Sequence, residues 1–115
     1  MEKNVRISML LQTYGKLLTE KQVDFLDDYY NNDLSLSEIA ENNNITRQAA
    51  RDNIKKGEQK LFEFEEKLGI MEKTMIQEQK ISEILTKITK IKSKSSDKKV
   101  QHILEEVKAE LNCLV

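Results

Sequence analysis

The side chains with the clearest chemistry are basic and amide groups near the middle of the chain. They are Arg47, Gln48, Arg51, Lys55 and Lys56. Arginine binds a phosphate with a fork of hydrogen bonds or stacks on an unpaired base, which suits folded RNA. In a helix-turn-helix motif, the N-terminal end of the second helix contacts the major groove of DNA. These five residues therefore predict a nucleic-acid-binding surface.

Two helix-start signals, separated by a polar turn, must hold this surface. Ser35 and Glu38 form a capping box, in which each side chain accepts a hydrogen bond from the other residue's backbone N–H. Asparagines at 42–44 end that helix in a turn, and Thr46 is placed to cap the next helix. Small alanines on both helices allow a close crossing. The pattern predicts a helix-turn-helix.

Apolar residues at helical spacing extend this pattern toward the N-terminus. A first amphipathic helix carries its stripe from Ile7 to Leu18. A capping box of Thr19 and Gln22 then starts a second helix, which residues 31–33 end with side chains that tolerate turns. The helix-turn-helix is therefore expected to pack against two preceding helices.

The helix that follows Thr46 is predicted to be long. An apolar seam runs along it from Ala50 to Leu68, and Gly69 is expected just past its end. Gly57 lies on the seam, where glycine costs about 1 kcal/mol relative to alanine. We therefore expect a close helix approach at Gly57.

The C-terminal part is aliphatic, since every aromatic residue precedes residue 65. We expect a fifth helix to about Ile91, a polar linker over 92–99, and a last helix capped by Ser95 or Ser96. The last helix carries an apolar stripe: Val100, Ile103, Leu104, Val107 and Leu111. The stripe either packs internally, if the last two helices fold back on the fourth, or forms the face of a homodimer, which we favour. The expected domains are a helix-turn-helix domain over 1–69 and a helical extension or dimerisation hairpin over 70–115.

The composition favours an all-α fold of long helices. The 115 residues include no proline and only three glycines, and 34% are charged. The net charge of −1 requires any nucleic-acid site to be local. A single cysteine fits a reducing cytoplasm, and no apolar run reaches the ~20 residues needed to span a bilayer.

Acidic residues complicate a DNA-binding role. Between Thr19 and Thr46 one lysine, Lys21, is outnumbered by seven acids. These are Glu20, Asp24, Asp27, Asp28, Asp33, Glu38 and Glu41. Helices that flank a recognition helix lie beside phosphates, which repel carboxylates. We therefore expect the motif to bind duplex DNA weakly or only with the help of another factor. Structured RNA or a protein is correspondingly favoured as the partner.

A second basic cluster lies toward the C-terminus. It contains Lys87, Lys90, Lys92, Lys94, Lys98 and Lys99, with only Asp97 opposing. It could follow an RNA backbone, or it could be a solvated helix end and linker, because lysine is favourable near a helix C-terminus. We favour the second interpretation.

Other chemically active residue types are few. His102 is the only histidine, and no cysteine or serine partner is near it in sequence, so we expect a surface residue. Cys113 is expected to be structural or incidental. Tyr29 and Tyr30 could stack on bases, but we favour core and core-edge positions. With no phosphate-binding glycine loop, zinc ligand set or nucleophile motif, we expect no enzyme, cofactor, metal or small-molecule substrate.

Two stretches of sequence carry a family resemblance. Leu-Ser-Leu-Ser-Glu-Ile-Ala at 34–40, with the basic helix that follows, resembles region 4 of bacterial sigma factors. Ala-Ala-Arg-Asp-Asn-Ile-Lys-Lys at 49–56, together with the chain length, is similar to the YlxM family. Together these resemblances imply a sigma region-4-like helix-turn-helix bundle with a long fourth helix and a C-terminal helical extension. The YlxM resemblance also implies a regulatory role in the signal recognition particle pathway, inferred from gene context.

Three functions follow as hypotheses. The first is a regulatory adaptor that meets the RNA or protein of the signal recognition particle through the basic helix. The second is a transcription regulator that binds promoter DNA through the same residues. The third is a protein-interaction module. The acidic helices disfavour the second and are neutral or helpful to the third.

Overall fold

The computed structural model describes residues 2–114, which form helices and turns with no β-strand. In chain order the elements are α1 (Lys3–Tyr14), the 3-10 turn η1 (Gly15–Leu17), α2 (Glu20–Tyr30), α3 (Leu36–Asn42), α4 (Arg47–Leu68), α5 (Ile70–Lys94) and α6 (Lys98–Asn112). The all-α prediction is confirmed. The chain divides into two compact units, Met1–Met71 and Glu72–Val115.

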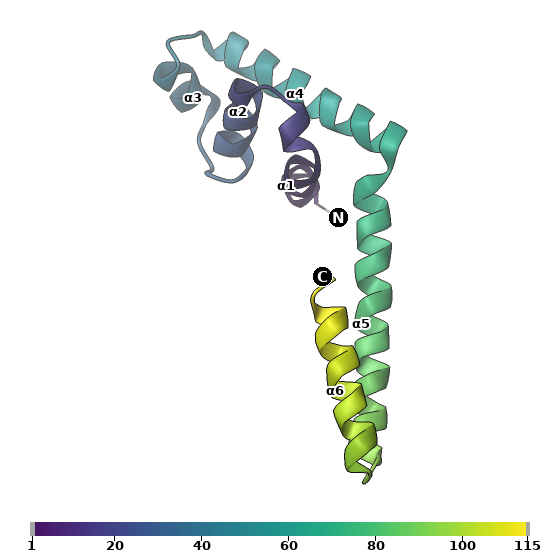
Figure 1. Cartoon of the computed structure of the whole chain (residues 1–115). Coiled ribbons are helices and arrows are strands. Elements are labelled where there is room, and N and C mark those ends of the chain that lie inside the picture. The colour runs from purple at the N-terminus through teal and green to yellow at the C-terminus, as the bar shows by residue number, and fades with distance from the viewer. Residues whose placement is uncertain (1, 115) are drawn as a thin grey trace. The chain divides into compact units, whose positions relative to one another are not determined.

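In the first unit, α4 is the helix against which the others pack. Figure 1 shows α3, α2 and α1 lying in that order along α4, and each of the three contacts it. The core side chains are Ile7, Leu10, Leu11, Tyr14, Leu18, Phe25, Leu26, Ile39, Ala40, Ala50, Ile54 and Leu61. The long seam of α4 therefore faces a core built from all three preceding helices.

The helix starts follow the predicted capping signals. The Thr19 hydroxyl accepts the Gln22 N–H and the Gln22 side chain accepts the Thr19 N–H, so the first capping box is complete. Ser35 and Glu38 make the same reciprocal pair at α3. At α4, the Thr46 hydroxyl accepts the Ala49 N–H. Each cap satisfies backbone donors that a helix start leaves unpaired.

The turn between α3 and α4 is held by asparagine. The Asn43 side-chain amide donates to the carbonyl of Ile39 (2.8 Å), and the N–H of Ile45 donates to the carbonyl of Ala40 (3.0 Å). Asn44 has a φ of +55°, in the left-handed region that asparagine tolerates better than most residues. This turn ends α3 and sets the direction in which α4 starts.

Gly57 permits the closest approach between α2 and α4. A Cβ at position 57 would lie 2.8 Å from Cδ1 and 3.2 Å from Cγ of Leu26. Leu26 is fully buried and cannot turn toward solvent. The expected close approach is confirmed.

A buried tyrosine joins α1 to the end of α4. The Tyr14 hydroxyl donates to Glu65 Oε1 (2.5 Å) and accepts the N–H of Ile70 (3.0 Å), while the N–H of Met71 donates to the same carboxylate oxygen (3.0 Å). Gly69, with a φ of +61°, makes the turn between α4 and α5 and ends α4 as predicted. Burial, followed by the hydrogen bond to Glu65, raises the pKa of Tyr14. The phenol therefore remains a donor.

Two details of the predicted apolar stripes are wrong. The first helix ends at Tyr14 instead of continuing to Leu18, because the 3-10 turn η1 intervenes before Thr19 adopts the extended conformation of an N-cap. Leu17 is consequently 58% exposed while Leu18 is buried. The seam of α4 also ends early, and Leu68 is half exposed.

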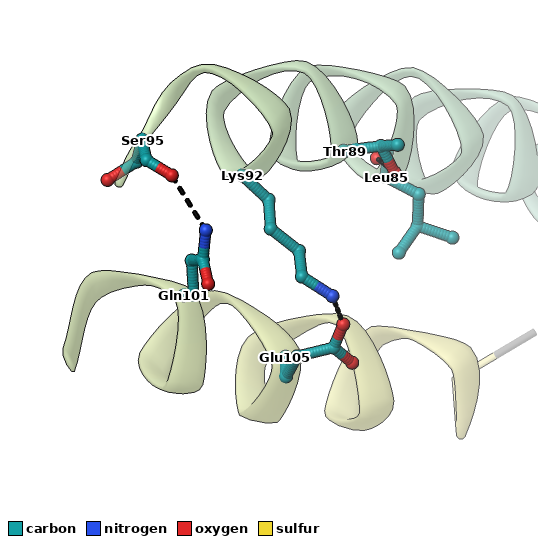
Figure 2. Close-up of polar contacts among 6 residues, drawn as sticks. All are labelled: Leu85, Thr89, Lys92, Ser95, Gln101 and Glu105. Atoms are coloured by element: carbon teal, nitrogen blue, oxygen red, sulfur yellow. Dashed lines mark hydrogen bonds and ion pairs between the residues drawn. The ribbon is translucent and has the colours of Figure 1, made fainter. Parts of the chain in front are cut away.

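In the second unit, α6 folds back alongside α5 (Figure 1). Figure 2 shows two polar contacts that hold α6: Lys92 of α5 forms an ion pair with Glu105, and the Gln101 amide donates to the carbonyl of Ser95 in the turn (2.7 Å). The buried side chains of this unit are Ile81 and Ile88. The hairpin is thus stabilised by a small apolar core and by an ion pair and a hydrogen bond near its turn.

The predicted linker over 92–99 is too long, and its predicted cap is wrong. Helix α5 continues to Lys94 and α6 begins at Lys98. The cap is Asp97, whose carboxylate accepts the N–H of Lys99 (2.9 Å), while the Ser95 hydroxyl accepts the N–H of Asp97 (3.3 Å). A charged acceptor bonds a helix-start N–H more strongly than a hydroxyl does, which favours Asp97.

The positive φ at position 44 gives a first test. Alanine in the left-handed region is disfavoured by about 1–2 kcal/mol, whereas glycine is not. We expect Asn44→Ala to lower the free energy of unfolding by about 1 kcal/mol and Asn44→Gly to leave it unchanged or raise it. Urea unfolding followed by circular dichroism measures both. Asn42→Ala, inside α3, is the matched control and should not destabilise; equal loss in all three variants would contradict the assigned turn.

The close approach at Gly57 gives a second test. Alanine there gains about 1 kcal/mol in helix propensity, but overpacking against Leu26 costs about 1–3 kcal/mol. We expect Gly57→Ala to lower the melting temperature, although alanine is the better helix former. Gln59→Ala, an exposed position of the same helix, should not lower it. A more stable Gly57→Ala protein would show that the two helices are farther apart.

Candidate nucleic-acid interface

The first two turns of α4 present the predicted basic residues to solvent. Arg47, Arg51 and Lys55 are exposed and, four residues apart, follow one another along one side of the helix. Among residues 2–114 no salt bridge engages any of the three. We call these three residues the basic stripe. It begins at the capped end of α4, where the helix dipole also favours an anion.

The other two predicted residues are placed differently. Gln48 is exposed, and its side-chain amide donates to Asp52 Oδ1 (3.0 Å) one turn along the helix. Lys56 is exposed but lines a separate shallow surface depression with Gln22 and Lys60. The structure therefore brings Arg51 and Lys55 together and directs Lys56 elsewhere.

Beside the basic stripe lies a surface pocket of about 230 Å³ that also involves α1 and α2. We call it the tyrosine pocket. Its lining includes Lys3, Tyr29, Tyr30, Arg51, Lys55 and Glu58. Neither Lys3 nor Glu58 was identified from the sequence, because they are 55 residues apart and no local spacing connects them.

Glu58 organises one wall of the tyrosine pocket. Its carboxylate accepts a hydrogen bond from the Tyr30 hydroxyl and forms a salt bridge with Lys3 (3.4 Å). Only 13% of the Glu58 side chain is exposed, against 63% for Lys3. Burial first, and then the hydrogen bond to Glu58, raises the pKa of Tyr30. Tyr30 therefore stays protonated and holds its ring in place as a donor.

The acids predicted to oppose phosphate lie on α2, α3 and the loop between them. Most are exposed, while Asp27 and Asp28 are half-buried at the C-terminal end of α2. There the amides of Asn31 and Asn32 donate to Asp27 (2.6 Å) and Asp28 (3.1 Å), respectively. These bonds offset the unfavourable position of two carboxylates near a helix C-terminus. Positive charge is thus concentrated at the start of α4 and negative charge on α2, α3 and the loop between them.

Comparison with known families agrees with this arrangement of helices. Residues 1–107 match the family described as "Putative helix-turn-helix protein, YlxM / p13 like". The chain belongs to this family. The resemblance seen in the sequence is thereby confirmed, and α3, the asparagine turn and α4 form the helix-turn-helix.

Members of the YlxM / p13-like family with similar sequences come from several bacteria. The chain is 44% identical to a UPF0122 protein of Clostridium acetobutylicum over 97% of both chains. It is 43% identical to one from Acetivibrio thermocellus over its own full length and 98% of the relative. A UPF0122 protein of Malacoplasma penetrans is 59% identical over 55% of this chain and 59% of its own.

The second basic cluster of this YlxM / p13-like protein lies in the second unit. Lys87, Lys90 and Lys94 are exposed on α5, whereas Lys92 is only partly exposed and pairs with Glu105 (Figure 2). Lys98 and Lys99 are exposed in the first turn of α6. One lysine of the cluster therefore contributes to the hairpin itself.

The remaining candidate residues are at the surface. His102 is exposed and lies beside Glu106, with Nε2 3.0 Å from Oε1. Cys113 is exposed with a free thiol. Among the described residues, no group of acidic, histidine or cysteine side chains is arranged to hold a metal ion, and no helix is long and apolar enough to cross a membrane.

Proposed function

We propose that this protein is a cytoplasmic regulator that binds nucleic acid, structured RNA in particular, through the start of α4. The supporting observation is the basic stripe, because Arg47, Arg51 and Lys55 are exposed and unpaired at the N-terminal end of the second helix of a helix-turn-helix. Such ends contact nucleic acid in known motifs. The stripe has the geometry for binding and no accompanying nucleophile, so we assign no catalysis.

RNA is favoured over duplex DNA by the charge on α2 and α3. A recognition helix can enter a major groove only if its flanking helices approach the phosphates on either side. The acids there oppose that approach, whereas a folded RNA offers a local, irregular site that α4 can meet alone. We therefore place DNA-dependent transcriptional regulation second.

The proposed setting is the signal recognition particle pathway, as the resemblance to the YlxM family implies. The RNA or the protein of that particle is the proposed partner. In either case α4 supplies the contact, and the acidic helices stay free for a basic protein surface.

We further propose that the protein acts as a homodimer through the stripe on α6. Among the apolar residues of the stripe, Val100, Ile103 and Val107 are exposed, and Leu104 and Leu111 are half-buried. Ile84 and Ile91 are exposed on α5 as well. Val100, Ile103 and Val107 recur at spacings of three and four residues and therefore lie along one side of α6, and exposed apolar side chains gathered in this way are typical of interaction surfaces.

Removing one charge from the basic stripe tests the proposed function. We expect Arg51→Ala to weaken binding to a fluorescent, structured RNA by about tenfold and to reduce the slope of log affinity against log salt by about 1. Fluorescence anisotropy across a salt series measures both. Lys67→Ala, which removes the same charge at the far end of α4, is the control and should change neither by a comparable amount. Equal effects of the two variants would contradict the assigned surface, and tight, sequence-selective binding to duplex DNA at physiological salt would support the second candidate.

Charge on the α6 stripe tests the dimer. We expect Val107→Asp to convert the dimer to a monomer in sedimentation equilibrium, because an aspartate in an apolar interface loses solvation without a partner. Ala109→Asp places the same charge on another side of α6 and should leave the dimer intact. A wild-type protein that sediments as a monomer would contradict the proposal.

A further inference from the structure

The tyrosine pocket combines features that the basic stripe lacks. Its lining also includes Ile54, which is buried, and Leu36, which is half-buried. Tyr29, which also lines the pocket, is 36% exposed as a residue, so part of it is available for contact. Aromatic, apolar and basic side chains thus line one pocket.

The position of the Tyr29 ring is fixed by its neighbour. The rings of Tyr29 and Tyr30 pack edge to face, with centroids 5.0 Å apart and planes at 88°. Tyr30 in turn is anchored by its hydroxyl on Glu58. A ring held in this way loses little conformational freedom when a ligand stacks on it.

The charged residues that line the pocket carry a net positive charge. Lys3 is paired with Glu58, so these two charges neutralise each other. Arg51 and Lys55 line the same pocket, and no salt bridge within residues 2–114 engages either. The pocket therefore offers two cations to an anion beside the exposed tyrosine ring.

We propose that the tyrosine pocket binds one unpaired nucleotide, with its base stacked on Tyr29 and its phosphate held by Arg51 and Lys55. The proposal rests on the proposed function and specifies its ligand. Aromatic rings stack on any base, since every base has a π-face, and arginine binds the phosphate in a fork. A base inside an intact duplex is stacked between its neighbours and reaches a pocket only by flipping out. The site thus selects a bulged, looped or single-stranded nucleotide over a paired one.

A pair of duplexes tests this selection. The probes are a blunt RNA duplex that carries one bulged adenosine and the same duplex without the bulge, each fluorescently labelled and titrated with the full-length protein. DNA versions of both probes show whether the unpaired nucleotide must be a ribonucleotide. We expect the wild type to bind the bulged RNA at least about fivefold more tightly, which is the lower end of the stacking effect of one base.

Substitutions at Tyr29 isolate the stacking. Tyr29→Ala should abolish the preference for the bulge, because the unpaired base loses the ring on which it stacks. Tyr29→Phe, which keeps the ring, should retain the preference. Circular dichroism melting should show both variants folded, because the position is partly exposed.

The outcomes separate the two proposals. A wild type that binds both duplexes equally, with Tyr29→Ala unchanged and Arg51→Ala weakened, would overturn the nucleotide pocket and leave the proposed function standing. Failure to bind any of the four probes at about 0.15 M salt would overturn both. A preference for the bulge that Tyr29→Ala loses and that the wild type and Tyr29→Phe keep would support the nucleotide pocket.

Discussion

The packing of α2 on α4 at Gly57 is the contact on which the rest of the first unit depends. Leu26 occupies the space that a side chain at position 57 would take. Because α1, α2 and α3 all pack on α4, a wider separation at this point would alter the core that they share. It would also move Tyr30 away from Glu58 and open the wall of the tyrosine pocket. The functional surface is thus fixed by a contact on the buried face of the same helix.

Local signals in the sequence determine where α2, α3 and α4 begin, so these helix starts could be predicted from the sequence alone. The capping boxes at Thr19 and Ser35 each need only a partner three residues away, so their chemistry is complete within one turn. The cap of α6 was missed because Ser95, Ser96 and Asp97 are all acceptable N-caps in sequence. The hydrogen bond that the Asp97 carboxylate accepts from the Lys99 N–H shows that Asp97 is the cap.

The candidate site could be predicted only in part. The residues at the start of α4 follow from the helix-turn-helix pattern, because exposure there depends on a short segment. The tyrosine pocket could not be derived, since Lys3, Tyr30 and Glu58 lie on three helices and meet only through tertiary packing. The expected core and core-edge positions of Tyr29 and Tyr30 fit Tyr30, which is half-buried, but are wrong for Tyr29, which is 36% exposed. The sequence showed that acidic residues precede the basic ones, and the structure places the acids on α2, α3 and their loop and the basic stripe on α4.

The central claim is that nucleic acid meets the protein at the start of α4. Amide chemical shifts of ¹⁵N-labelled protein, recorded by NMR during a titration with the bulged RNA duplex, test it most directly. We expect the largest changes at residues 46–56 and at Tyr29, with little change on the acidic face of α2. Largest changes at residues 87–99, around the second basic cluster, would contradict it.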